Sequence, residues 1–156
     1  MKTWARGFTL IELMVAISLV GILLALVAPY LSTAIGNARA RNVVSQFRQD
    51  FNWLRNQAVT GNRVVSLTLN ADCSWQSLID GVANASHSMS ATELGNASSN
   101  IACTASNATV LPVTFNFSGQ GFVAPAATFV FNGPNNQNWP VQILTSGTVV
   151  LTQGVQ

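Results

Sequence analysis

Positive charge is missing from this sequence after Arg63, and charge of either sign is missing after Glu93. Lys, Arg, Asp and Glu make up only 8% of the 156 residues, whereas an average soluble protein has roughly 25%. DNA and anionic lipid are bound by clustered positive charge, so any such contact should lie between residues 39 and 63. A surface with so little charge is expected to meet other subunits or a membrane.

Groups that carry out catalysis or bind metals are also scarce. His87 is the only histidine, and no Cys or carboxylate stands near it at the spacing of a metal site. We therefore expect His87 to be an exposed loop residue. The sequence has no Gly-x-Ser-x-Gly turn and no phosphate-binding loop. We expect no enzymatic activity, no metal site and no cofactor.

Cysteine is limited to Cys73 and Cys103, which both lie outside the apolar N-terminal segment. If this part of the chain is exported, the two can form a disulfide, and closing a loop of about 30 residues would stabilise the fold by roughly 3 to 4 kcal/mol. In a cytosolic protein they would instead remain free thiols.

The N-terminal segment is the longest apolar run. From Phe8 to Leu31 the only charged residue is Glu12, and 24 helical residues span about 36 Å. Lys2 and Arg6 precede the run, so the positive-inside rule predicts a cytoplasmic N-terminus and an exported C-terminal part. An acid within such a segment is costly and therefore suggests a function.

Two ordinary explanations leave Glu12 without a role. A signal peptide cleaved after Ala28 would have a shorter apolar region without an acid, and Pro29 directly after the cut disfavours cleavage. A plain single-pass anchor explains the length of the run but not the carboxylate.

The stretch Gly7-Phe8-Thr9-Leu10-Ile11-Glu12 resembles the leader junction of type IV pilins and type II secretion pseudopilins. The resemblance implies that a prepilin peptidase cuts after Gly7 and that the new N-terminal residue, Phe8, is methylated. It also implies that Glu12 pairs with the positive α-amine of Phe8 on an adjacent subunit and so sets the stagger during assembly. Pro29 would bend the long helix or mark where it melts in the filament.

After Pro29 the sequence keeps a helical period up to Gly61, a reasonable helix end. One face of this helix is apolar and is expected to bury against a sheet; its residues are Ala40, Val44, Phe47, Phe51, Leu54 and Ala58. Arg41, Arg48 and Arg55 are spaced by seven and form a stripe beside that face. This stripe is either a solvated border, a contact with a neighbouring subunit, or a contact with DNA phosphates.

Beyond Arg63 the sequence alternates in the manner of short antiparallel strands separated by turn residues. The predicted strands are residues 64–69, 113–117, 127–131, 141–144 and 148–152. Residues 82–109 are rich in Ser, Ala and Asn, which predicts a long mobile surface loop tied back by the cysteine pair. The fold class is therefore α+β: one long N-terminal helix, membrane-spanning in its first half, packed on a small antiparallel β-sheet domain.

This order of elements resembles the GspH/FimT branch of the pilin-like proteins, through residues 51–58 and 61–67 and through Trp75. Some members of that branch bind DNA through a Gly-Arg-x-Arg stretch near the C-terminus, where this chain reads Gly147-Thr148-Val149-Val150. DNA is therefore only a weakly supported partner. The organisation implied is a leader, a transmembrane or filament-core helix, an amphipathic helix and a β-rich periplasmic domain, at residues 1–7, 8–31, 32–61 and 62–156.

The function implied is that of a minor pilin that initiates a type IV pilus or sits in its tip complex. The alternatives are a type II secretion pseudopilin and an anchored module that binds DNA or a surface ligand. Expected partners are other pilins or pseudopilins, the prepilin peptidase, the inner membrane and the assembly platform. The expected location is the bacterial inner membrane, with the C-terminal domain in the periplasm, and then the filament.

Overall fold

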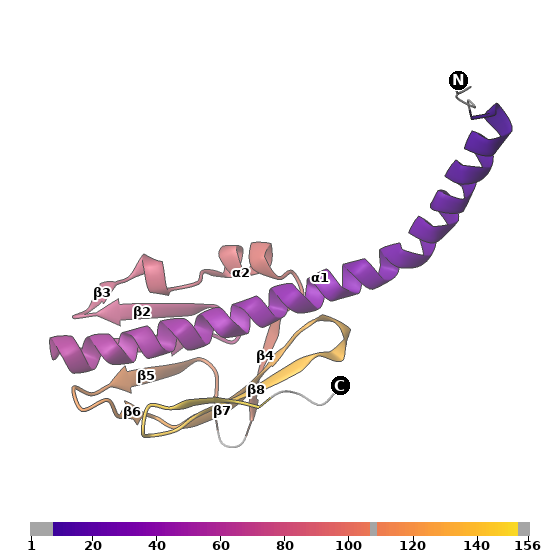
Figure 1. Ribbon diagram of the computed structural model, residues 1–156. Helices are drawn as coiled ribbons and strands as arrows, with labels where there is room; N and C mark the ends of the chain where they lie inside the picture. Colours follow the sequence, from indigo (N-terminus) through magenta and orange to yellow (C-terminus); the bar gives the residue numbers. More distant parts are fainter. Residues whose placement is uncertain (1–7, 107–108, 153–156) are drawn as a thin grey trace, which may run out of the picture. The chain divides into compact units, whose positions relative to one another are not determined.

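The computed structural model describes residues 8–106 and 109–152, apart from the side chains of residues 27–29. Gly7 therefore lies outside the described residues. The chain divides into two compact units, Met1–Ile35 and Gly36–Gln156, which we call the N-terminal unit and the globular unit. Helix α1 runs through both, from Leu10 to Gly61 (Figure 1).

The ends of α1 follow from local chemistry. At the start, the hydroxyl of Thr9 accepts a hydrogen bond from the backbone N–H of Glu12, as an N-cap residue does. At the other end, Asn62 adopts the left-handed conformation with φ 48°, which stops a helix. The predicted helix end at Gly61 is confirmed.

Two antiparallel sheets pack along α1 in the globular unit (Figure 1). The first sheet has the order β3-β2-β1-β5-β6; its strands are β1 (Val65–Leu69), β2 (Trp75–Ile79), β3 (Val82–Ala83), β5 (Val113–Phe117) and β6 (Val123–Ala124). The second sheet has the order β4-β7-β8-β9; its strands are β4 (Ala102–Ser106), β7 (Ala127–Asn132), β8 (Asn138–Ile143) and β9 (Val149–Leu151). The shorter helical elements are η1 (Ala85–His87), α2 (Ala91–Ala97) and η2 (Pro134–Asn136).

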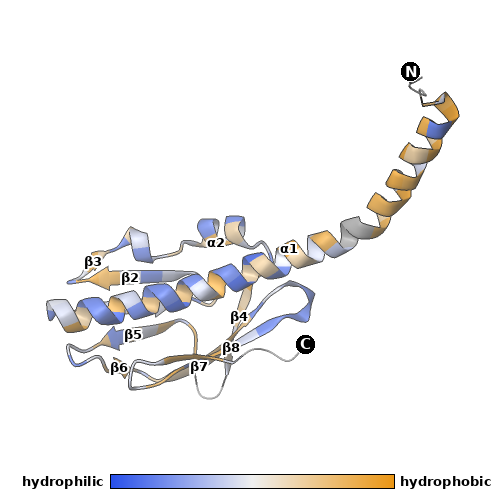
Figure 2. Ribbon diagram, viewed as in Figure 1, coloured by the Kyte–Doolittle hydropathy of each residue, from blue (hydrophilic) through white to orange (hydrophobic). Residues whose placement is uncertain are grey.

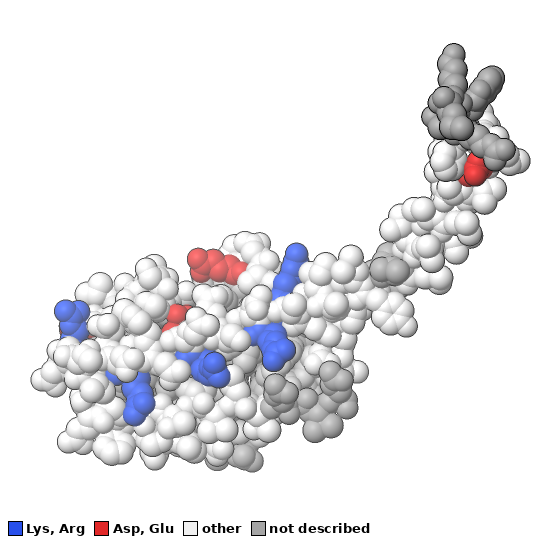
Figure 3. Space-filling view, viewed as in Figure 1, with Lys and Arg blue, Asp and Glu red and all other residues white. Residues whose placement is uncertain are grey.

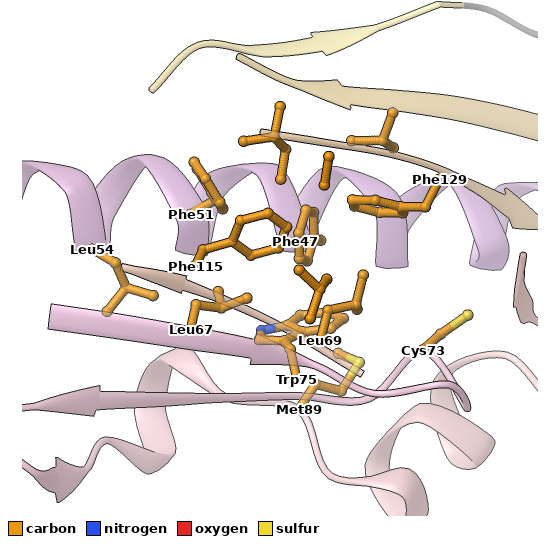
Figure 4. Close-up of a cluster of buried hydrophobic side chains, with 14 of the residues drawn as sticks. Phe47, Phe51, Leu54, Leu67, Leu69, Cys73, Trp75, Met89, Phe115 and Phe129 are labelled. Carbon is orange, nitrogen blue, oxygen red and sulfur yellow. The ribbon is translucent and has the colours of Figure 1, made fainter. Parts of the chain in front are cut away.

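The core is aromatic and centres on Phe47 of α1 (Figure 4). The ring centroid of Phe47 lies 5.4 Å from that of Trp75 on β2 and 5.7 Å from that of Phe129 on β7. One helical turn on, the Phe51 ring lies 5.5 Å from Phe115 on β5. All six residues of the predicted apolar face are at most 2% exposed. The helix therefore joins both sheets through edge-to-face ring contacts, which add to the burial of apolar area.

The predicted antiparallel β-sheet domain contains two sheets. One expectation about the distal part was wrong. Residues 82–109 are not one long irregular loop, because β3, η1, α2 and β4 all fall within this range. Helix α2 has a capping box, in which Ser90 and Glu93 exchange side-chain and backbone hydrogen bonds, and such a box stabilises a short helix by satisfying its free N–H groups.

Candidate assembly sites

The N-terminal unit presents the residues of the predicted leader junction. Phe8 is 80% exposed, and Glu12 lies in the first turn of α1. A carboxylate there is favoured by the positive end of the helix dipole, so Glu12 also has a local reason to occupy this position. No salt bridge to Glu12 occurs within residues 8–106 and 109–152.

The described part of α1 in the N-terminal unit consists mostly of hydrophobic residues (Figure 2). Every large hydrophobic side chain described from Phe8 to Ile35 is at least 45% exposed, a surface that calls for lipid or other subunits. In the described part of the chain no single helix is both long and apolar enough to cross a membrane, although the bent pair Leu10–Leu26 and Tyr30–Gly61 would qualify by length and composition. Pro29 falls between these segments, and its side chain is outside the described part.

The arginine stripe divides into two kinds of residue. Arg41 and Arg48 are exposed, and neither has a hydrogen bond or ion pair to another described residue. Arg55 is half-buried, and its Nε donates a 2.8 Å hydrogen bond to the carbonyl oxygen of Gly121. Basic side chains are spread along α1 on the face drawn in Figure 3.

Two glycines make room for Arg55. Gly121 and Gly147 have φ of +83° and +75°, a backbone region that glycine adopts at no steric cost. A Cβ on Gly147 would overlap both the Arg55 side chain and the Gly121 carbonyl oxygen. Arg55 is therefore hydrogen-bonded to the turn after β5 and lies close to the turn after β8. This intramolecular role was not predicted from the sequence.

Cys73 and Cys103 form a disulfide with a Cα–Cα distance of 5.2 Å. Cys103 lies on β4 of the second sheet, and Cys73 lies in the turn between β1 and β2 of the first. The disulfide therefore links the two sheets.

The turn between β1 and β2 also holds Asp72. The side chain and the backbone N–H of Ser74 both donate to Asp72 Oδ1. These hydrogen bonds lower the pKa of the Asp72 carboxyl from its ordinary 3.8.

A polar cluster on the other flank of α1 was missed by the sequence analysis. Asp50 is 6% exposed; its Oδ2 accepts a 3.1 Å hydrogen bond from Trp75 Nε1, and its Oδ1 lies 2.9 Å from His87 Nδ1. The His87 ring stacks on Trp53 with a centroid distance of 3.6 Å. The expectation that His87 is an exposed loop residue was wrong: its side chain is only 25% exposed and has a carboxylate partner.

Comparison with protein families decides what kind of chain this is. The family model described as "Type II transport protein GspH" matches residues 43–148, and the model described as "Prokaryotic N-terminal methylation motif" matches residues 5–28. The chain belongs to the GspH family. No curated protein sequence matches it.

The fold is also that of a GspH-type protein. The minor pseudopilin EpsH from the type 2 secretion system of Vibrio cholerae aligns with a TM-score of 0.54 and 12% identity, over 76% of this chain and 97% of that chain. The sequence-based fold class and the resemblance to the GspH/FimT branch are confirmed. The family and the methylation motif together make this GspH-type chain a minor pilin or pseudopilin.

Family membership also indicates the partners and the location of the protein in general terms. A pilin-like chain of this family works by assembly with other pilin-like subunits and their machinery, and the methylation motif implies an anchor in the inner membrane with the globular unit in the periplasm. The family is structural and is not known for catalysis. Within residues 8–106 and 109–152, no three His, Cys, Asp or Glu side chains gather as a metal site would require.

Proposed function

We propose that the chain is cut after Gly7, methylated on Phe8, and assembled through residues 8–31 as a minor subunit of a filament that starts in the inner membrane. The observation that carries this proposal is the overlap of the methylation motif at residues 5–28 with a helix whose large apolar side chains are exposed. Such a surface is stable only against lipid or neighbouring helices. Glu12 is then the counter-charge for the new α-amine of an adjacent subunit.

Two machines are candidates. The sequence resemblance points first to a type IV pilus, with this chain in its initiation or tip complex. The description of the matching family as a type II transport protein favours a type II secretion pseudopilus. The two candidates share the processing step, the anchor and the mode of assembly, and they differ in the subunits that accompany this chain.

A DNA-binding module is less well supported. Arg55 is engaged with Gly121 inside the chain, which leaves Arg41 and Arg48 as the exposed cations of the stripe. Two phosphate contacts supply little affinity at physiological salt.

The decisive experiment is the intact mass of the protein purified from the membranes of its own host. Loss of residues 1–7 together with one added methyl group supports the pilin pathway, whereas an uncut chain or a cut after Ala28 rejects it. Mass spectrometry of the subunits that co-purify then separates the two machines. A Glu12→Gln variant should still be processed but should be depleted from the sheared filament fraction, because the carboxylate that pairs with the neighbouring amine is gone.

A further inference from the structure

Most charged side chains of the globular unit have a partner inside the chain. Asp50 is buried against Trp75 and His87, Arg55 is bonded to Gly121, and Arg63 lies 3.9 Å from Asp80. The carboxylates of the two remaining acids, Asp72 and Glu93, accept hydrogen bonds from Ser74 and Ser90. Among the described residues this leaves Arg39, Arg41 and Arg48 without an intramolecular partner.

Arg41 and Arg48 lie on the same flank of α1. A separation of seven residues is nearly two turns, so the two side chains start about 10 Å apart and differ by roughly 20° around the helix axis. Arg39 is rotated from Arg41 by roughly 200° and therefore lies on the opposite flank. Ser45 and Asn52 lie beside the pair and are short and uncharged. The pair forms a two-point cationic strip on the helix surface, while Arg55, the third arginine of the stripe, is half-buried and bonded to Gly121.

The strip is unusual in so uncharged a chain. The second sheet adds no charge to its surroundings, because no residue after Glu93 is charged. Arginine is enriched in protein interfaces, where its planar guanidinium binds carboxylates through two parallel hydrogen bonds. The surface around Arg41 and Arg48 is uncharged. It is therefore complementary in charge to a partner surface that has two carboxylates and is otherwise neutral.

A second copy of this chain is a poor match for the strip. Of the four acids in the globular unit, Asp50 is buried and Asp80 is close to Arg63. One carboxylate oxygen of Asp72 and one of Glu93 already accept hydrogen bonds from neighbouring serines. The carboxylates that complement the strip should therefore come from a different subunit.

We propose that Arg41 and Arg48 dock a different pilin-like subunit, which presents two carboxylates about 10 Å apart. The proposal rests on the proposed function, because it assumes that the chain assembles with other pilin-like proteins. It adds the chemistry of the partner and the residues that select it. Charge pairs of this kind set specificity and speed of association more than strength, and they weaken as salt rises.

The test compares full-length Arg41→Glu/Arg48→Glu with full-length Arg39→Glu in the original host. Arg39 is the matched control, because it is an exposed, unpartnered arginine on the opposite flank of the same helix. Each protein is isolated from detergent-solubilised membranes at low salt, and co-purifying chains that carry an N-terminal methylation motif are quantified by mass spectrometry. Processing at Gly7 and the thermal unfolding of each variant are measured on the same samples.

We expect the double reversal to reduce one such partner by about tenfold, with normal processing and unfolding, while Arg39→Glu retains it. Exchanging the partner's two acids for arginine should restore recovery with the double reversal. If wild type and the double reversal recover equal amounts of the partner subunit, the docking proposal is overturned but the proposed function stays intact. Failure of the wild type to recover any pilin-like partner, together with an unprocessed N-terminus, would instead overturn the proposed function. A duplex oligonucleotide whose binding is lost in the double reversal, with unchanged subunit recovery, would assign the strip to DNA and also overturn the docking proposal.

Discussion

His87 Nδ1 lies 2.9 Å from Asp50 Oδ1, although the two residues are 37 positions apart in the chain. Asp50 belongs to α1 and His87 to η1, so the contact fastens the segment after β3 to the helix. The other carboxylate oxygen of Asp50 is used by Trp75 Nε1. A buried carboxylate is tolerated only when its oxygens are satisfied in this way, and the cluster should therefore stabilise the fold.

Removing the carboxylate tests this role. Asp50→Ala leaves the buried indole N–H of Trp75 without an acceptor, and we expect it to lower the free energy of unfolding by about 3 kcal/mol. His87→Ala removes one hydrogen bond and the stack on Trp53, and it should cost about 1 kcal/mol. Urea unfolding of the Gly36–Gln156 unit measures both, since this unit contains every buried hydrophobic residue in the described part of the chain.

Asn52→Ala is the control for this series, because Asn52 is exposed on the same helix and its removal should change stability by no more than about 0.5 kcal/mol. A wild-type unfolding curve for Asp50→Ala would show that the cluster adds no stability.

The disulfide gives the second stability prediction. Replacing both Cys73 and Cys103 by serine opens a loop with a sequence separation of 30 residues, and we expect a loss of about 3 to 4 kcal/mol. The measurement is urea unfolding with and without dithiothreitol. The wild type should lose stability on reduction and the double variant should not respond. Equal midpoints for the oxidised wild type and the double variant would contradict the prediction.

Local periodicity explains what the sequence could predict. The α1 face from Ala40 to Ala58 repeats every three or four residues, and every predicted member is buried because a helix has only one side to turn toward a sheet. The strand β5 has the alternating burial expected of a strand with one face on the core. Both patterns lie within one element and need no knowledge of the rest of the fold.

The missed features depend on contacts between distant segments or on weak local signals. Asp50 and His87 meet only after β2 has brought η1 back to the helix. The contact between them therefore could not be predicted from the residues around either one. Strand β2 was not predicted. Its Ser77 is fully buried and hydrogen-bonded to Ser88, and a polar residue at a buried position breaks the alternation of apolar and polar residues by which a strand is predicted. Helix α2 did have a readable signal, the spacing of Ser90 and Glu93 in a capping box.

The close approach of Arg55 to two turns predicts a strong effect at Gly147. Gly147→Ala adds a methyl group that overlaps Arg55 and the Gly121 carbonyl oxygen, in addition to the cost of φ +75°. We expect a loss of about 3 kcal/mol or more in urea unfolding. Gly81→Ala is the matched control, because Gly81 has φ +81° but no atom within 4 Å of the added Cβ. It should lose only about 1 kcal/mol, and equal losses would show that the contact with Arg55 is unimportant.

The Asp72 turn predicts a pH dependence of stability. In the folded chain, hydrogen bonds from the Ser74 side chain and backbone lower the pKa of Asp72 below its ordinary value of 3.8. A carboxyl group with a lowered folded pKa stabilises the fold above its unfolded pKa, and this contribution is lost as the pH falls through the folded value. Because Asp72 is exposed, the contribution should be below about 1 kcal/mol.

Asp72→Asn should therefore be less stable than wild type near neutral pH, and the difference should shrink as the pH falls below 3.8. Urea midpoints of the Gly36–Gln156 unit at a series of acidic pH values measure this convergence. Gln76→Ala is the control, since Gln76 is exposed and uncharged and its curve should stay parallel to that of wild type. A gap between Asp72→Asn and wild type that is constant with pH would mean that the carboxylate charge does not contribute to the turn, and that only the shape of the side chain does.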